Sequence, residues 1–156
     1  VKDNIGLLDQ HVSYLEMVSD RLDQMQWCDK KRTDMRTLYV LERFHFTHVY
    51  HYDHMSWFDV KDVDQRLNKL NCKLCVLTID DSIIKERLFA RRNPEWRSYL
   101  SRFGKTKDEI AGYFASQQRQ LMDLCEKSEM DTLIVDTTVR CVDDLLGQVL
   151  DYWGVI

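Results

Sequence analysis

Two short runs of continuously apolar residues constrain the fold of this chain more than any other feature. One covers residues 73–79 (KLCVLTI) and the other covers residues 132–136 (TLIVD), while a third and shorter run covers residues 38–41 (LYVL). A strand that is apolar on both faces is typical of a parallel sheet buried between helices. The sequence therefore predicts an α/β fold, with a three-layer parallel sheet that has helices on both faces.

Helix-length segments separate these runs. Apolar side chains recur every three or four positions over residues 4–27, over residues 59–71 and near the end of the chain. Residues 106–109 (TKDE) form a capping box that opens a helix to about residue 127. The segment 4–27 suits packing along another helix, either within its own domain or in a homodimer. A length of 156 residues predicts one domain over the whole chain.

The composition excludes two classes of protein. The net charge is −4 and no apolar run reaches 18 residues, so we expect neither a nucleic-acid polymer as partner nor a membrane span. No leader segment begins the chain and the five cysteines are an odd number, which favours reduced thiols and a cytoplasmic location. Cys72 and Cys75 form a CxxC pair without the second pair that a zinc ribbon needs, so we expect structural thiols there.

Polar residues follow each predicted strand. In open α/β sheets, ligands bind beyond the carboxyl ends of the strands, which makes these residues the first candidates for a site. They are Glu42 and Arg43, Asp80 and Asp81, and Asp136, Thr137 and Thr138. Asp80 and Asp81 also suit a simpler role as helix caps.

A basic segment covers residues 85–107. It holds eight cations against two acidic residues, so it has a charge of +6 and leaves −10 for the rest of the chain. Five of the eight are arginines, whose guanidinium groups bind phosphate through paired hydrogen bonds. Pro94 interrupts the helix that carries Arg87 and Arg91, and this favours a lid that closes over phosphates. A solvated helix face is the alternative.

Gly104, Lys105 and Thr106 match the end of the phosphate-binding Walker A loop, GxxxxGK[ST]. The motif needs glycine at position 99, which is Tyr99, and no strand is predicted before it. We therefore interpret these residues as the start of the following helix. The sequence contains no other GK[ST] and no GxGxxG, which argues against an ordinary dinucleotide-binding protein.

Four histidines stand at every third position of an aromatic segment, and they are His45, His48, His51 and His54. A three-residue step drifts around a helix, so only neighbouring pairs could share a metal ion. A metal site of this kind is an alternative that we do not adopt. We favour an aromatic segment that lines a pocket and stacks on a planar base, and plain packing is the simplest alternative.

Several of these features together resemble one family. LYVLERFH (38–45) resembles the strand and (D/E)R(Y/F/H/S) motif of thymidylate kinases and deoxynucleoside kinases. The helix at 59–71, the strand after it and IKERL (84–88) with its further arginines resemble the family's next helix, strand and arginine-rich lid. TLIVDTT (132–138) resembles its last strand and adenine-side loop. The resemblance runs from about residue 36 to the end and implies the P-loop kinase-like fold.

The resemblance also implies ATP and Mg2+ as partners, a nucleoside or nucleoside monophosphate as acceptor, and a role for nine residues. The implied catalytic residues are Glu42, near magnesium and the phosphates, Arg43, at the acceptor, and the lid residues Arg87 and Arg91. The implied substrate-binding residues are Arg43, His45, Tyr50 and Arg92. The implied ATP-binding residues are Arg87, Thr137 and Thr138. Lid arginines of this kind stabilise charge during phosphoryl transfer.

The chain departs from the family at its start. Family members begin with a strand, a Walker A loop and a helix, which have no counterpart in these 156 residues, and the start at Val1 favours a fragment. We therefore expect a nucleoside or nucleotide kinase-like phosphotransferase that is incomplete at the N-terminus. As an isolated chain it is expected to bind ATP poorly and to transfer no phosphate. The alternative is a non-catalytic nucleotide-binding or interaction domain without a Walker A loop.

Overall fold

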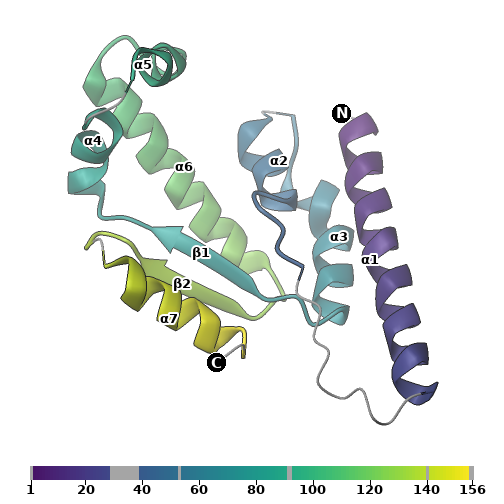
Figure 1. The fold of residues 1–156 in the computed structure, drawn as a ribbon. Helices are drawn as coiled ribbons and strands as arrows, with labels where there is room; N and C mark the ends of the chain where they lie inside the picture. Colours follow the sequence, from purple (N-terminus) through teal and green to yellow (C-terminus); the bar gives the residue numbers. More distant parts are fainter. Residues whose placement is uncertain (1, 29–38, 53, 91–92, 140, 155–156) are drawn as a thin grey trace. The chain divides into compact units, whose positions relative to one another are not determined.

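The structure is a computed structural model that describes residues 2–28, 39–52, 54–90, 93–139 and 141–154 (Figure 1). The described residues form seven helices and two strands. They group into two compact units: unit 1 comprises Val1–Cys72 with Ser128–Met130, and unit 2 comprises Lys73–Lys127 with Asp131–Ile156. Each unit has its own buried residues, and the single domain expected from the length stays a prediction.

Unit 1 contains three helices, α1 (Lys2–Cys28), α2 (His45–His51) and α3 (Trp57–Lys69) (Figure 1). Both α1 and α2 pack against α3. The helices predicted at residues 4–27 and 59–71 are confirmed. A capping box starts α3, because the backbone amide of Ser56 donates to the Asp59 carboxylate at 2.7 Å.

Two side chains of α1 are almost fully buried, Leu8 at 3% and Val12 at 0% exposure. The same helix exposes Leu7, Tyr14 and Met17. Burial of two aliphatic side chains stabilises α1 on its own unit by about 1.5–3 kcal/mol each. Packing within its own domain, one of the two roles predicted for this helix, is therefore confirmed, and a homodimer through residues 4–27 stays a prediction.

Arg66 of α3 fixes α1 in place. Its Nε donates to Glu16 Oε1 at 2.8 Å and its Nη2 donates to Glu16 Oε2 at 2.6 Å, which is a two-pronged ion pair. The same guanidinium also donates to Ser13 Oγ at 2.8 Å and to the carboxylate of Asp9. Because this fork reaches side chains on successive turns of α1, it sets the register of α1 along α3.

Unit 2 contains both strands. In chain order it consists of β1 (Leu74–Thr78), α4 (Asp81–Phe89), α5 (Pro94–Leu100), α6 (Lys107–Lys127), β2 (Thr132–Asp136) and α7 (Val142–Tyr152) (Figure 1). The strands predicted at 73–79 and 132–136 are confirmed, and they pair in parallel from Leu74↔Thr132 to Thr78↔Asp136. The helix break predicted at Pro94 is also confirmed, but a further helix, α5, starts there, with the Asn93 side chain as its cap.

The predicted three-layer sheet is wrong. The described residues are mostly helical and hold a single two-stranded sheet. Of the run predicted as a third strand, Leu38 lies outside the described residues. Tyr39, Val40 and Leu41 are in no strand, and they are 48%, 65% and 41% exposed. An apolar run becomes a strand only where a neighbouring strand accepts its backbone hydrogen bonds, and no pairing partner is described for these residues.

The two faces of the sheet are covered unequally. Val76 and Ile134 are register partners and so share a face, yet Val76 is 3% and Ile134 is 48% exposed. On the opposite face, Leu77 is 59% exposed beside the buried Val135. On each face, one of the two register partners is therefore buried and the other is exposed. Figure 1 shows α7 along β2, in agreement with their packing contact.

The segment that resembles the end of a Walker A loop forms the start of α6, as predicted. The carboxylate of Glu109 accepts from the backbone amides of Lys105 at 2.7 Å and Thr106 at 3.3 Å. In return, the Thr106 hydroxyl accepts from the amide of Glu109 at 3.2 Å. The capping box therefore uses the amide groups that a phosphate would need at this helix end.

Gly104 allows this tight turn, and we expect Gly104→Ala to lower the free energy of unfolding by about 1 kcal/mol. A Cβ atom at Gly104 would lie 2.8 Å from Glu109 Cβ and 3.0 Å from the amide nitrogen of Ile110. Gly112→Ala is the matched control, because nothing lies within 4 Å of a Cβ there, and this change in a helix interior should stabilise. Chemical denaturation measures both variants. Equal effects of the two changes would contradict a steric role for Gly104.

Candidate functional site

Polar groups gather at the carboxyl ends of β1 and β2 in unit 2. The site consists of Asp80, Arg87, Asp136, Thr137 and Thr138, and we call it the strand-end cluster. Parallel pairing places the ends of both strands side by side, since Thr78 and Asp136 are register partners. Asp80 starts α4 directly after β1, and Arg87 follows two turns later on the same helix. The sequence-predicted residues Arg87, Thr137 and Thr138 are thus brought together.

Arg87 binds the loop after β2 through its guanidinium group. Its Nη1 donates to the Thr137 carbonyl at 2.8 Å and its Nη2 donates to the Thr138 carbonyl at 2.9 Å. The loop is also held from β1, because the amide and the hydroxyl of Thr137 both donate to the Thr78 carbonyl, at 2.8 and 2.7 Å. In addition, the amide of Asp80 donates to Thr138 Oγ1 at 2.8 Å. Two strands and one helix therefore fix this loop.

Two carboxylates lie in the strand-end cluster, and both accept hydrogen bonds. Asp80 caps α4 as predicted, accepting from the Ser82 hydroxyl and amide, and these bonds lower the pKa of Asp80. Hydrogen bonds from Thr138 lower the pKa of Asp136. Both groups are therefore ionised at neutral pH. Asp81, the other expected cap, lies in the first turn of α4 and pairs with Arg119 at 2.9 Å.

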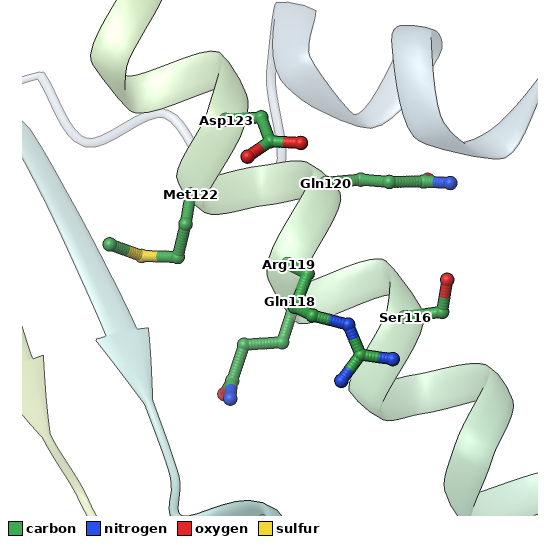
Figure 2. Close-up of a pocket in the computed structure, with 6 residues that line it drawn as sticks. All are labelled: Ser116, Gln118, Arg119, Gln120, Met122 and Asp123. Atoms are coloured by element: carbon green, nitrogen blue, oxygen red, sulfur yellow. The ribbon is translucent and has the colours of Figure 1, made fainter.

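Gln118 of α6 binds the backbone of Ile79, directly after β1. Its side-chain amide accepts from the Ile79 backbone amide at 2.9 Å and donates to the Ile79 carbonyl at 2.8 Å. Figure 2 shows Gln118 and Arg119 on α6 beside a hollow that is also lined by Ser116, Gln120, Met122 and Asp123. All six lining residues come from this one helix, so the hollow has no opposing wall that could enclose a ligand.

The basic segment adjoins this cluster along the chain. Lys85 pairs with Asp108 at 2.6 Å, Lys107 lies over the Phe89 ring and Arg102 over the Tyr99 ring. The side chains of Arg97 and Lys105 are exposed. Arg91 and Arg92 lie outside the described residues, so the predicted lid stays a prediction.

Glu42 and Arg43, the predicted residues of the family motif, lie in unit 1. They form an exposed pair, with Arg43 Nε 3.6 Å from Glu42 Oε1. Arg43 has a φ of 50°, in the left-handed region that costs a residue other than glycine about 1–2 kcal/mol. Such strain concentrates at functional positions, which is consistent with a role for Arg43. Both roles stay predictions.

His45 joins a buried polar network in unit 1 that centres on Asp64. His45 and Asp64 are 3% and 0% exposed, and His45 Nε2 lies 3.0 Å from Asp64 Oδ1. A carboxylate only accepts, so His45 donates here. Ser128 Oγ donates to the same oxygen at 2.7 Å, and the Glu129 amide donates to Asp64 Oδ2 at 3.1 Å. His45 therefore packs within unit 1, and its substrate-binding role stays a prediction.

Asp64 was missed by sequence reasoning, although a signal for it existed. It lies on the same side of α3 as Val60, Val63 and Leu67, all of them buried. An acidic residue within a buried apolar stripe must be paired, because an unpaired buried charge is costly. Through its hydrogen bonds, Asp64 links α3 to α2 and to residues 128–130.

The other predicted aromatic residues pack among themselves. The Tyr50 hydroxyl lies 3.1 Å from Thr47 Oγ1, and the His48 ring stacks on Tyr52. Burial and the neighbouring His45 and His51 lower the pKa of His48, so its neutral form is favoured. Among the described residues, no group of three or more His, Cys, Asp or Glu side chains could hold a metal ion.

The described residues do not form a protein-only magnesium site. Glu42 is paired with Arg43, and one oxygen of Asp80 and one of Asp136, Oδ1 in each, already accept hydrogen bonds. Magnesium in nucleotide sites is held mainly by the phosphates and by water, so an ATP ligand would bring the ion with it.

Comparisons with protein-family models, with curated proteins and with solved structures found no match. Among the described residues, no helix has both the length and the apolar content that crossing a membrane requires. The site is therefore assigned from its own geometry.

Proposed function

We propose that the protein binds a nucleotide in the manner of nucleoside and nucleotide kinases, with its nucleoside part at the strand-end cluster. The observation that carries this proposal is the loop of Thr137 and Thr138, fixed beyond the carboxyl ends of two parallel strands by Arg87. Ligands of open α/β sheets bind at this edge. The two ionised carboxylates of the cluster, Asp80 and Asp136, present acceptors for the amino group of a base and the hydroxyls of a sugar.

In this proposal, the basic segment of residues 85–107 binds the phosphates of the nucleotide. Residues 85–107 carry a charge of +6 in a chain of net charge −4, so a polyanion is drawn to this part of unit 2. Arg97 and Lys105 are exposed there, whereas Lys85 is already paired with Asp108. Arg91 and Arg92 follow α4 directly along the chain and are the sequence-predicted phosphate ligands.

We expect the purified chain to bind ATP weakly and to transfer no phosphate to thymidine or thymidine monophosphate. Without a Walker A loop, the β- and γ-phosphates lack the backbone cradle that phosphoryl transfer uses. Amide NMR during an ATP titration should show shifts at Thr137, Thr138 and the residues around them. Absence of shifts at millimolar ATP would refute the binding, and a phosphorylated product would refute the lack of transfer.

The double variant Arg91→Ala/Arg92→Ala tests the phosphate side. It should weaken binding of ATP and of inorganic triphosphate and leave binding of adenosine unchanged, since adenosine has no phosphate. Arg21→Ala, an exposed arginine of α1, is the matched control for the loss of positive charge. Equal affinities of the double variant and the control for triphosphate would show that these arginines do not bind phosphate.

A further inference from the structure

We propose that Arg87 is a positioning residue, which holds the loop of Thr137 and Thr138 in shape for the nucleoside part of the ligand and does not bind its phosphates. The proposal rests on the nucleotide-binding function proposed above and specifies the task of one residue in it. It differs from the role that the family resemblance implies, in which Arg87 neutralises phosphate charge in a lid.

Both terminal nitrogens of Arg87 donate to the loop, and they use two of the five N–H donors of its guanidinium group. A guanidinium group binds phosphate best with two parallel N–H donors, and both terminal nitrogens of Arg87 donate to backbone carbonyls instead, at 2.8 and 2.9 Å. Nη1 also lies 3.5 Å from Thr137 Oγ1. Arg87 is half-buried, so turning to a phosphate would leave two carbonyls without these partners.

The loop needs this partner to keep its shape. The amide of Thr137 is used by the Thr78 carbonyl and the amide of Thr138 by the Asp136 carboxylate, at 2.8 Å each. The carbonyls of Thr137 and Thr138 accept from α4, where Arg87 is the described side chain that donates to both. Loss of the guanidinium would release one side of the loop while β1 still holds the other side.

The charges around Arg87 disfavour a phosphate there. Asp80 and Asp136 have lowered pKa values and are ionised at neutral pH, and both lie in the same cluster. Two carboxylates repel a phosphate group and accept hydrogen bonds from neutral donors. Val139 follows the loop and is 77% exposed, which adds an apolar surface for the face of a planar base. The nucleoside part of a nucleotide has both features, donor groups and an apolar face.

Three probes separate positioning from phosphate binding: adenosine, ATP and inorganic triphosphate, each titrated by NMR against the chain and against Arg87→Ala. We expect Arg87→Ala to lower the affinities for adenosine and for ATP by the same factor, about tenfold. The affinity for inorganic triphosphate should stay unchanged. Loss of triphosphate and ATP affinity with unchanged adenosine affinity would overturn the proposal. If the unaltered chain binds none of the probes, the proposed function itself fails, which is a distinct result.

Chemical rescue of adenosine binding distinguishes loss of the Arg87 guanidinium group from unfolding of the variant. Free guanidinium ion at a non-denaturing concentration should restore adenosine binding to Arg87→Ala, because it can occupy the gap between the two carbonyls. Sodium chloride at the same concentration should not restore it. Arg87→Lys supplies a charge without the fork and should recover only part of the affinity. Full recovery by lysine, or no rescue by guanidinium in a variant with an unchanged NMR spectrum elsewhere, would refute the positioning role.

Discussion

Asp64→Ala is expected to lower the free energy of unfolding by about 3–5 kcal/mol, the largest effect among these predictions. The change leaves the buried His45 ring, the Ser128 hydroxyl and the Glu129 amide without their common acceptor. The His45 ring, 3% exposed, then loses a hydrogen bond where water cannot replace it, and Ser128 and Glu129 lose theirs at the edge of the same network. Chemical denaturation followed by circular dichroism measures the loss.

Two further variants make this test specific. Asp64→Asn keeps the shape of the side chain but replaces one acceptor oxygen by an NH2 group, which meets a donor, so we expect a smaller loss of about 1–3 kcal/mol. Lys61→Ala on the exposed side of α3 is the control and should change stability by about 0.5 kcal/mol or less. A loss for Asp64→Ala as small as that of the control would show that the network does not stabilise unit 1.

The same carboxylate makes stability depend on acid pH. Burial acts to raise the pKa of Asp64, but the hydrogen bonds from His45, Ser128 and Glu129 outweigh it, and the net shift is downward. The folded pKa therefore lies below the unfolded value of about 3.9. The stability given by ionised Asp64 is present above about pH 4 and is lost as the pH falls through the folded pKa. Unfolding measured across this range should show a shallower acid dependence in Asp64→Asn than in the unaltered chain.

Arg66→Ala should cost about 2 kcal/mol and detach α1 from α3. The guanidinium donates to Glu16, Ser13 and Asp9, and its side chain is only 17% exposed. The carboxylates are themselves partly exposed, at 38% and 58%, so solvent screens them and keeps the effect below that of a buried pair. Hydrogen exchange of the α1 amides, together with denaturation, measures the change.

The stability that Arg66 provides depends on the forked geometry of its guanidinium group, and not on its charge alone. Arg66→Lys keeps the charge but cannot donate to Glu16 through two prongs and to Ser13 and Asp9 at the same time, so we expect it to lose most of the stability. Arg21→Ala on the same α1 helix is exposed and serves as the control. If the lysine variant is as stable as the unaltered chain, charge alone and not the fork holds α1.

Local patterns in the sequence predicted the helices and strands that depend on neighbours along the chain. The apolar runs at 73–79 and 132–136 became β1 and β2, and the capping box at Thr106 opened α6. The helix before Pro94 ends at Phe89, and Pro94, which lacks an amide hydrogen, starts the next helix, α5, which the sequence reasoning did not predict.

The candidate site was predicted in part. Sequence reasoning placed Arg87, Thr137 and Thr138 in one site, and the structure brings these three together. It could not show that Arg87 donates to the loop carbonyls, because that depends on how α4 packs against the end of β2. His45 was expected to contact substrate, and its partner Asp64 stands 19 residues away in sequence, with Ser128 a further 64 residues on. No local pattern reports a contact over such a distance.

By itself, the sequence determined most of the helical and extended segments, several helix starts, and where positive charge is concentrated, because each follows from residues a few positions apart. The tertiary structure alone decided how many strands pair, which apolar residues are covered, and which polar groups share a hydrogen bond. Residues 39–41 show the reason. They are apolar enough for a strand, but a strand is completed by a neighbour, and only the folded chain determines whether that neighbour is there.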